Sequence, residues 1–320
     1  MVRVNKKHIL TSIFFYAAVI GIVLFSLFPF LQILSVSVKD VQDMANPSLI
    51  PKSIHWDAYK EILGFEPMDQ TQDTAIKAIL ANPNLTKAQR SLLMEKFQNK
   101  NSFPFLRYML NSFTLSITAT MFSMTLAIFS AYAIARLKFR GVTAMRRGTL
   151  FVYLLGGVVL MVPLYQMGTS LGLTNTPAGV FFYMILIYIM QTLPLALYML
   201  GNYFRGIPRS IEEAAVIDGC GRIQIILKII VPLSRPVLIT VFIYCFIIGW
   251  NEYLYASVFL KPFNDLRTLS VAIQALFYSK NSIWGRIMAA STLTLTPIVL
   301  FFFLLSKNMI SGLSDGGVKE

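Results

Sequence analysis

Charged, metal-binding and disulfide-forming residues are scarce in this chain. Of its 320 residues only 13% are charged, and the chain holds two histidines and two cysteines. His8 and His55 are isolated, while Cys220 lies in a loop and Cys245 in an apolar run, at different predicted depths. We therefore expect neither a metal site nor a disulfide, because both need side chains at close and defined spacing.

Sequence motifs for catalysis are absent as well. The chain has no G-x-x-x-x-G-K-[ST] loop, which cradles the phosphates of ATP in many ATPases. It shows no pair of carboxylates within an apolar run and no set of serine, histidine and aspartate. We expect a protein that is not an enzyme, with no catalytic residue, no ATPase site and no cofactor on this chain.

Apolar residues dominate what is present. They make up 56% of the chain, and the mean hydropathy is +0.63. A bilayer core of about 30 Å takes about 20 helical residues to cross. The apolar runs of that length are 9–37, 107–135, 149–171, 178–200, 236–260 and 284–306. The alternating pattern of a membrane barrel is absent. The sequence predicts an all-α membrane protein with six transmembrane helices.

Three of the runs after the first contain an internal proline. Pro163, Pro194 and Pro297 would each remove a backbone N–H and kink the helix around it. Each proline either marks a hinge or a pathway, or is a kink that neighbouring helices accommodate.

Lysine and arginine gather in alternate loops, and this pattern predicts the orientation. They concentrate before 9–37, at 136–148 and 205–235, and after residue 306. Because cytoplasmic loops carry the excess of basic residues, both termini are predicted to be cytoplasmic. The net charge of +13 is then a topology signal and not a nucleic-acid-binding face. The run 9–37 is too long for a signal-peptide core, so we expect a retained first helix.

Four regions follow from this topology. They are the N-terminus and first transmembrane helix at 1–38, an external loop or insertion at 39–106, a five-helix core at 107–306 that includes a cytoplasmic loop at 205–236, and a cytoplasmic tail at 307–320. In the external region, Thr86 and Gln89 predict a capping box that opens a helix, and 73–80 predicts an earlier helix. This region is either a small cap on the helices or a contact surface for an external partner.

The cytoplasmic loop holds the most ordered pattern outside the apolar runs. Ser210 and, three residues later, Glu213 predict a capping box at the start of a short helix. Glu212 adds negative charge to the first turn, where the helix dipole favours it. Ala214 and Ala215 predict a small-residue face that allows close docking against another protein.

A sharp turn and a second helix are expected next. Asp218 and Gly219 predict the end of the first helix, because glycine takes the left-handed conformation that a helix end needs. A second apolar run from Ile223 to Val231 leads back towards the membrane and ends at Pro232. The pattern predicts a rigid coupling element.

The same loop resembles a family signature. It reads Glu213-Ala214-Ala215, three residues, Gly219, nine residues, Ile229, one residue, Val231-Pro232. This closely resembles E-A-A-x3-G-x9-I-x-L-P, the signature of permease subunits in bacterial ABC importers, with valine in place of leucine. Further stretches are similar to the second permease subunit of maltose and related oligosaccharide importers: Asn111-Ser112, Ala131 to Phe139, Trp250-Asn251-Glu252, Trp284-Gly285, Met288-Ala289-Ala290 and Gly312 to Lys319. The insertion around 65–103 conforms least.

The resemblance implies a division of labour among several subunits. The residues implied to couple to an ATPase are Ser210, Glu212, Glu213, Ala214, Ala215, Asp218, Gly219, Ile229 and Pro232. The tail residues implied to contact the ATPase are Gly316, Gly317, Val318 and Lys319. The implied partners are a second homologous permease subunit, two ATPase subunits that hold ATP and Mg, an extracytoplasmic sugar-binding protein and the lipid bilayer.

The predicted function is that of a transmembrane permease subunit in an ATP-driven, binding-protein-dependent sugar importer of the bacterial inner membrane. The alternative is an ion-coupled secondary carrier, although such carriers usually need ionisable or unwound polar sites near the midplane, and charged residues are nearly absent from the six runs.

Trp250, Asn251 and Glu252 are expected to form an interfacial anchor and helix end, or else a sugar contact. The outer loop at 259–283 either contacts the binding protein or only connects two helices. No substrate-binding residue is assigned.

Overall fold

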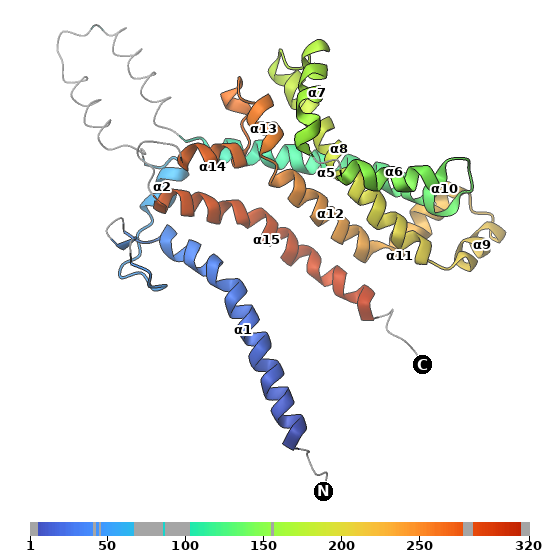
Figure 1. The fold of residues 1–320 in the computed structure, drawn as a ribbon, viewed down its shortest axis with the longest axis horizontal. Helices are drawn as coiled ribbons and strands as arrows, with labels where there is room; N and C mark the ends of the chain where they lie inside the picture. The colour runs from blue at the N-terminus through green and yellow to red at the C-terminus, as the bar shows by residue number, and fades with distance from the viewer. Residues whose placement is uncertain are drawn as a thin grey trace. The chain divides into compact units, whose positions relative to one another are not determined.

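The computed structural model of this protein describes residues 6–40, 43–44, 46–66, 86, 103–154, 157–277 and 284–314. Regular structure in these residues is helical, as Figure 1 shows. The longer helices are α1 (Lys6–Ser37), α5 (Phe105–Arg136), α6 (Val142–Leu154), α7 (Gly157–Ser170), α8 (Pro177–Gly206), α12 (Arg235–Trp250) and α15 (Trp284–Ser314). The shorter ones are α2 (Asp57–Ile62), α9 (Arg209–Ile217), α10 (Arg222–Ile225), a π-helix at Ile226–Ile230, α11 (Val231–Leu233), α13 (Leu254–Phe259), a 3-10 helix at Asn264–Leu266 and α14 (Leu269–Phe277).

The predicted spans largely match these helices. Five stretches are long and apolar enough to cross a membrane: Phe14–Ser37, Phe105–Arg136, Pro177–Gly206, Arg235–Phe259 and Trp284–Leu305. Counting the bent pair of α6 and α7 as one span gives six within the described residues. An all-helical protein of the predicted class is therefore confirmed.

The third span differs from the prediction of one continuous helix over 149–171. Helices α6 and α7 are bent by 94° relative to each other, so they do not form one continuous helix. The break does not fall at Pro163, which lies inside α7. It falls where Tyr255 packs on Gly157: the phenol donates a hydrogen bond to the Gly157 carbonyl at 2.5 Å, and a Cβ at position 157 would lie 3.2 Å from the tyrosine ring. A close ring contact at a glycine thus accompanies the bend.

The chain divides into two compact units. The first comprises Met1–Phe105 and Ala275–Thr294, and the second comprises Leu106–Gln274 and Leu295–Glu320. In the first unit the α2 carboxylate of Glu61 forms an ion pair with the Arg286 guanidinium of α15, with both side chains largely shielded. Ser37 and Tyr59 share a hydrogen bond of 2.8 Å, which joins the end of α1 to α2.

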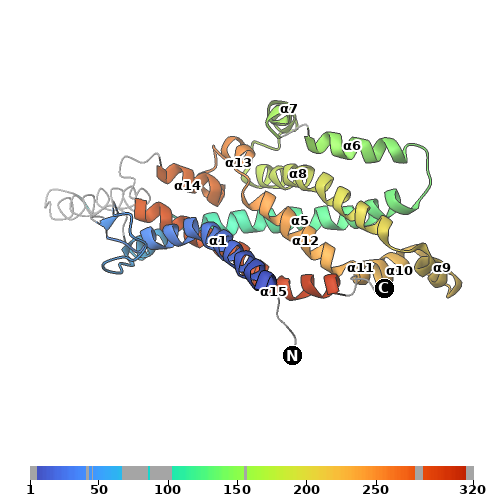
Figure 2. The same cartoon turned by 60° about the horizontal axis from the view of Figure 1, so that its bottom comes forward.

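The second unit is built around α5, α8 and α12. Helices α6 and α12 both pack against α8, and α9 and α13 lie at opposite ends of this unit in Figures 1 and 2. One buried apolar cluster joins α5, α8 and α12 to the α9 end: Met124, Ala127, Ala131, Tyr132, Ala196, Leu200, Phe204, Ile207, Ala215, Ile225, Ile226, Ile230, Val241 and Cys245. A second cluster joins α5 and α8 to α13 at the other end. Between the two clusters, the Ser123 and Thr192 hydroxyls share a hydrogen bond of 2.6 Å.

Several predictions lie outside the described residues. They concern the helix expected at 73–80, the helix after Thr86 with its partner Gln89, and the tail residues Gly316, Gly317, Val318 and Lys319. These stay predictions.

Candidate functional site

The short helix in the loop between α8 and α12 begins two residues earlier than the sequence predicts. Helix α9 starts at Arg209, its N-cap is Pro208, and the start carries no side-chain capping bond. The predicted capping box of Ser210 and Glu213 is therefore wrong. Pro208 sits at φ −59° and ψ 134°, and because its ring holds φ near this value, the chain can enter the helix directly after it. Ser210 is then already inside the first turn.

The Glu212 side chain contacts α5, in addition to placing negative charge in the first turn of its own helix. Its carboxylate lies 2.5 Å from the Arg136 Nε at the end of α5, and the exposed fractions of these side chains are 13% and 7%. The Tyr132 hydroxyl, one turn earlier on α5, donates a hydrogen bond of 2.9 Å to the other carboxylate oxygen of Glu212. The carboxylate thus has two partners from one helix.

Arg136 also holds the chain just before α9. Its Nη2 donates to the Ile207 carbonyl at 2.7 Å. A buried ion pair stabilises only when additional hydrogen bonds satisfy the charged groups, and here Tyr132 and Ile207 supply them. Helix α9 is therefore fixed to the end of α5 at its first turn and at Ile207, two residues before it begins.

The two alanines of the signature do not form one docking face. Ala215 is buried at 5% exposure in the cluster with α5 and α8, whereas Ala214 is exposed. The predicted shared small-residue face is therefore wrong, because successive helical residues point about 100° apart. The outer side of α9 carries Glu213 and Ala214 together with exposed apolar side chains, of which Val216 is 60% and Ile217 86% exposed.

The turn after α9 confirms the predicted role of glycine. Gly219 has φ +80°, in the left-handed region. The Cys220 N–H donates to the Ala215 carbonyl at 2.9 Å and the Gly219 N–H to the Val216 carbonyl at 3.0 Å. These two bonds define a Schellman motif, which satisfies the last carbonyls of the helix. Asp218 is the C-cap residue.

The second helix does not end at Pro232 as predicted. It runs through α10, the π-helix Ile226–Ile230 and α11, and it breaks at Ser234 before α12 begins. The wider π turn lies directly before Pro232, where a regular α-helix would bring the proline ring against the carbonyl four residues earlier. Ile229 lies in this π-helix and packs against the buried cluster, while Pro232 is exposed.

At the opposite end of the second unit, Asn111 and Ser112 hold the segment that follows α13. The Asn111 amide donates to the carbonyls of Asp265 and Arg267 at 2.9 and 3.1 Å. The Ser112 hydroxyl accepts the Leu269 N–H at 2.7 Å, at the start of α14. These two residues lie inside α5 and do not open it, since the helix begins at Phe105. The described part of the expected outer loop at 259–283 thus contains the 3-10 helix at Asn264–Leu266 and α14.

Trp250 and Glu252 are also placed differently from the prediction. Trp250 is 2% exposed and Glu252 is 7% exposed, so neither is an interfacial anchor. Asn251 ends α12, as expected. The Glu252 carboxylate accepts the backbone N–H groups of Tyr255 at 2.7 Å and Ala256 at 3.0 Å, and it therefore caps the start of α13.

Sequence reasoning missed Tyr132 and Arg136 as the residues that hold α9. A signal existed, because they lie four residues apart at the end of an apolar run and therefore share one helix face. Their partner in α9 could not be read from that spacing.

Comparison with known proteins identifies the family. Residues 123–314 match the family described as the binding-protein-dependent transport system inner membrane component. The chain belongs to this family. It is 36% identical over 317 residues to the inner membrane ABC transporter permease protein YcjP of Escherichia coli, which covers 98% of this chain and 99% of that protein. It is 31% identical over 299 residues to the maltose/maltodextrin transport system permease protein MalG of Yersinia pestis, covering 92% and 88% of the two chains.

A solved structure supports the fold. A bacterial ABC transporter involved in the import of the acidic polysaccharide alginate matches with a TM-score of 0.64 and 20% identity, over 96% of this chain and 99% of that one. The permease class is thus confirmed, and this permease is an inner membrane protein. The alternative of an ion-coupled secondary carrier finds no support among these relatives.

Proposed function

We propose that this permease subunit transports sugars in an ATP-driven importer, and that its substrates are oligosaccharides. The assembly would contain a second homologous permease, two ATPase subunits and an extracytoplasmic sugar-binding protein. Support comes from the similarity to MalG, a maltose/maltodextrin transport system permease protein. Both termini and α9 would face the cytoplasm, in line with the basic residues of the loops around α9.

The arrangement of α9 is the observation that carries this proposal. Its inner side is fixed to α5 through Glu212, Arg136 and Tyr132. Its outer side exposes Val216 and Ile217 in a loop rich in arginine. Exposed apolar side chains on a rigid, charged element are typical of a surface that a protein partner covers.

The chemistry of ATP hydrolysis would belong to the partner subunits, which would hold ATP and Mg. An ATPase that binds the outer side of α9 would displace α9 and, with it, the end of α5, because the Arg136–Glu212 ion pair joins the two helices. The coupling residues Glu213, Ala214 and Gly219 would shape and orient this contact surface. The tail from Gly316 to Lys319 would add a further ATPase contact.

A substitution at the tip of α9 tests the proposal. Ile217→Asp places a charge on an exposed side chain, so the permease should fold, yet ATPase association should weaken by about tenfold or more. Ile54→Asp is the matched control, since Ile54 is 64% exposed in the predicted external region. Co-purification of the ATPase and sugar uptake in proteoliposomes measure the effect.

The same proteoliposomes separate the importer from an ion-coupled carrier. The importer requires ATP, the ATPase subunits and the binding protein for uptake. Uptake by the permease alone in response to an imposed proton or sodium gradient would refute the proposal.

A further inference from the structure

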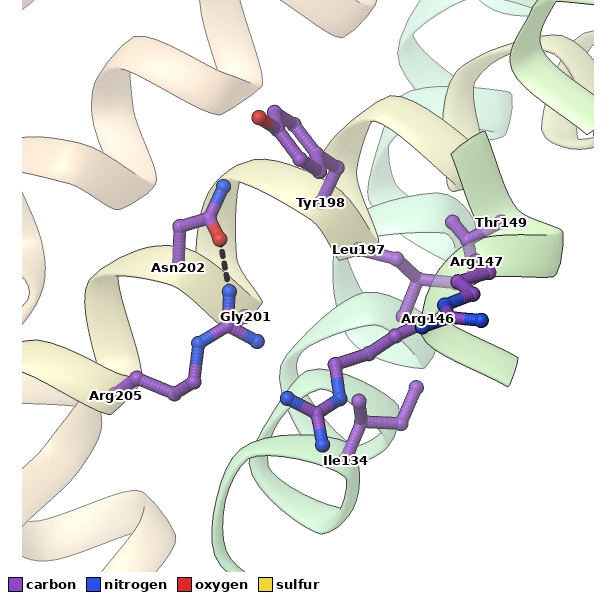
Figure 3. Close-up of a pocket in the computed structure, with 9 residues that line it drawn as sticks. All are labelled: Ile134, Arg146, Arg147, Thr149, Leu197, Tyr198, Gly201, Asn202 and Arg205. Carbon is purple, nitrogen blue, oxygen red and sulfur yellow. Dashed lines mark hydrogen bonds between the residues drawn. The ribbon is translucent and has the colours of Figure 1, made fainter. Parts of the chain in front are cut away.

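A basic pocket lies between α5, α6 and α8, away from the contacts of α9. It encloses about 630 Å³ of space that is open to solvent. Figure 3 shows the residues that line it: Ile134, Arg146, Arg147, Thr149, Leu197, Tyr198, Gly201, Asn202 and Arg205. The pocket belongs to the second unit alone.

The lining combines positive charge with neutral hydrogen-bonding groups. Three of the nine lining residues are arginines, and none is acidic. In the described part of the chain no ion pair is found for Arg146, Arg147 or Arg205. The Arg205 guanidinium donates to the Asn202 side-chain oxygen, which orients it, and Figure 3 shows Arg146 and Arg205 extending from α6 and α8 into the space between these helices.

One of the residues that line the pocket is a glycine, Gly201. Gly201 is buried, yet a Cβ at this position would meet no atom within 4 Å. The α8 backbone is therefore open to the cavity. Ile134 and Leu197 supply apolar surface beside the arginines, so the pocket offers both charge and hydrocarbon to a ligand.

The position of the pocket along the helices indicates its depth. Arg205 lies in the last turn of α8, and Arg146 and Arg147 lie in the first half of α6. In the orientation given under Proposed function, on which this inference rests, these are the cytoplasmic ends of membrane helices. Arginines at this depth lie at the level of the lipid headgroups.

We propose that this pocket binds the phosphate of an anionic phospholipid from the cytoplasmic leaflet. Guanidinium groups bind phosphate oxygens through paired, charge-assisted hydrogen bonds. Basic pockets between membrane helices on the cytoplasmic side are suited to such headgroups. The adjoining apolar residues would contact the acyl chains, which a soluble phosphate compound lacks. The lipid would join α6, the first half of the broken span, to α8.

Lipid retention by the purified full-length chain tests the assignment. Native mass spectrometry in mild detergent measures the binding of phosphatidylglycerol, with phosphatidylcholine as the zwitterionic reference. The pair Arg146→Gln and Arg205→Gln should weaken phosphatidylglycerol binding by about tenfold or more, since charged hydrogen bonds are lost. The pair Arg140→Gln and Arg235→Gln removes equal charge outside the pocket and should leave binding unchanged.

A second variant fills the pocket and keeps its charges. Gly201→Leu replaces a helical glycine by a better helix former in open space, so α8 should persist while the headgroup is displaced. Its phosphatidylglycerol binding should fall as far as in the double arginine variant. Circular dichroism and monodisperse elution confirm the fold of each variant.

Three results would overturn the assignment. Equal phosphatidylglycerol binding in all variants would show that the lipid binds elsewhere. Binding of inorganic phosphate alone, with the same dependence on Arg146 and Arg205, would assign the pocket to a soluble phosphate compound. Loss of ATPase association without a change in lipid binding would assign it to a protein partner.

The importer function is tested separately from the lipid site. Lipid retention is measured on the isolated chain and needs neither ATPase nor sugar. Labelling of Arg140→Cys from either side of the membrane, in a Cys220→Ser background because Cys220 is itself a partly exposed free thiol, determines the orientation independently.

Discussion

Arg136 at the end of α5 and Glu212 in the first turn of α9 form an ion pair at 2.5 Å, with exposed side-chain fractions of 7% and 13%. The pair joins two segments that are separate in the sequence. Arg136 ends a membrane-spanning helix, and Glu212 lies in the first turn of the loop helix. Tyr132 adds one hydrogen bond to the carboxylate and the Ile207 carbonyl accepts one from the guanidinium, so three contacts attach the start of α9 to α5.

Removal of one partner of this ion pair should destabilise the permease strongly. Glu212→Ala would leave the Arg136 charge shielded from water without its counter-ion, which typically costs about 3–5 kcal/mol. We expect a lower midpoint of thermal unfolding in detergent and weaker ATPase association. Glu213→Ala removes the neighbouring exposed carboxylate and should change stability by less than about 0.5 kcal/mol.

A double-mutant cycle distinguishes the ion pair from its individual residues. The combination Arg136→Met with Glu212→Leu removes both charges and should be less damaging than the sum of the single changes. Additive losses would show that the two residues act independently.

The turn at Gly219 should tolerate asparagine better than a β-branched residue. Its φ of +80° is strained for side chains with a Cβ, at about 1–2 kcal/mol, and valine adds its own rigidity. A Cβ at this position would meet no atom within 4 Å, so backbone conformation and not a clash causes the loss. ATP-driven uptake should fall in Gly219→Val and be largely retained in Gly219→Asn.

Gly221 provides the control for this turn. Its φ is −73°, and the nearest atom to an added Cβ is the Gln224 side-chain oxygen at 4.0 Å. Gly221→Ala should therefore leave uptake unchanged. If Gly219→Val transports as well as Gly221→Ala, the turn has no role in coupling.

The contact of α12 with α5 should depend on Gly249. An added Cβ would lie 3.3 Å from the Ser116 Cα, a backbone atom that cannot move aside freely. Gly249→Leu should separate the two helices and cost about 1–3 kcal/mol of unfolding free energy. Gly21→Leu places the same side chain on α1, where no atom lies within 4 Å, and thermal unfolding in detergent should be nearly unchanged.

Glu252 should stabilise α13 through its capping bonds. Glu252→Ala leaves the N–H groups of Tyr255 and Ala256 without this acceptor, and loss of a cap typically costs about 0.5–2 kcal/mol. Hydrogen exchange of the α13 amides should become faster, while α9 amides stay protected. Glu252→Gln keeps one carbonyl acceptor and should show a smaller effect. Equal exchange in wild type and Glu252→Ala would contradict the capping role.

Features that depend on consecutive residues could be predicted from the sequence. The membrane-crossing helices follow from the transfer of apolar side chains out of water, which sums along each run. The left-handed conformation at Gly219 follows from the absence of a Cβ in that one residue. The family signature lies in one continuous loop, so it too was visible without a fold.

The tertiary structure decided what depends on residues brought together from distant parts of the chain. Glu212 was expected to serve its own helix, but α5 brings Tyr132 and Arg136 to it. The third span breaks where Tyr255 packs on Gly157, a contact between segments far apart in the sequence. The physical reason is the same in both cases: backbone propensity is local, whereas a buried charge or a close ring contact depends on the partner that folding places beside it.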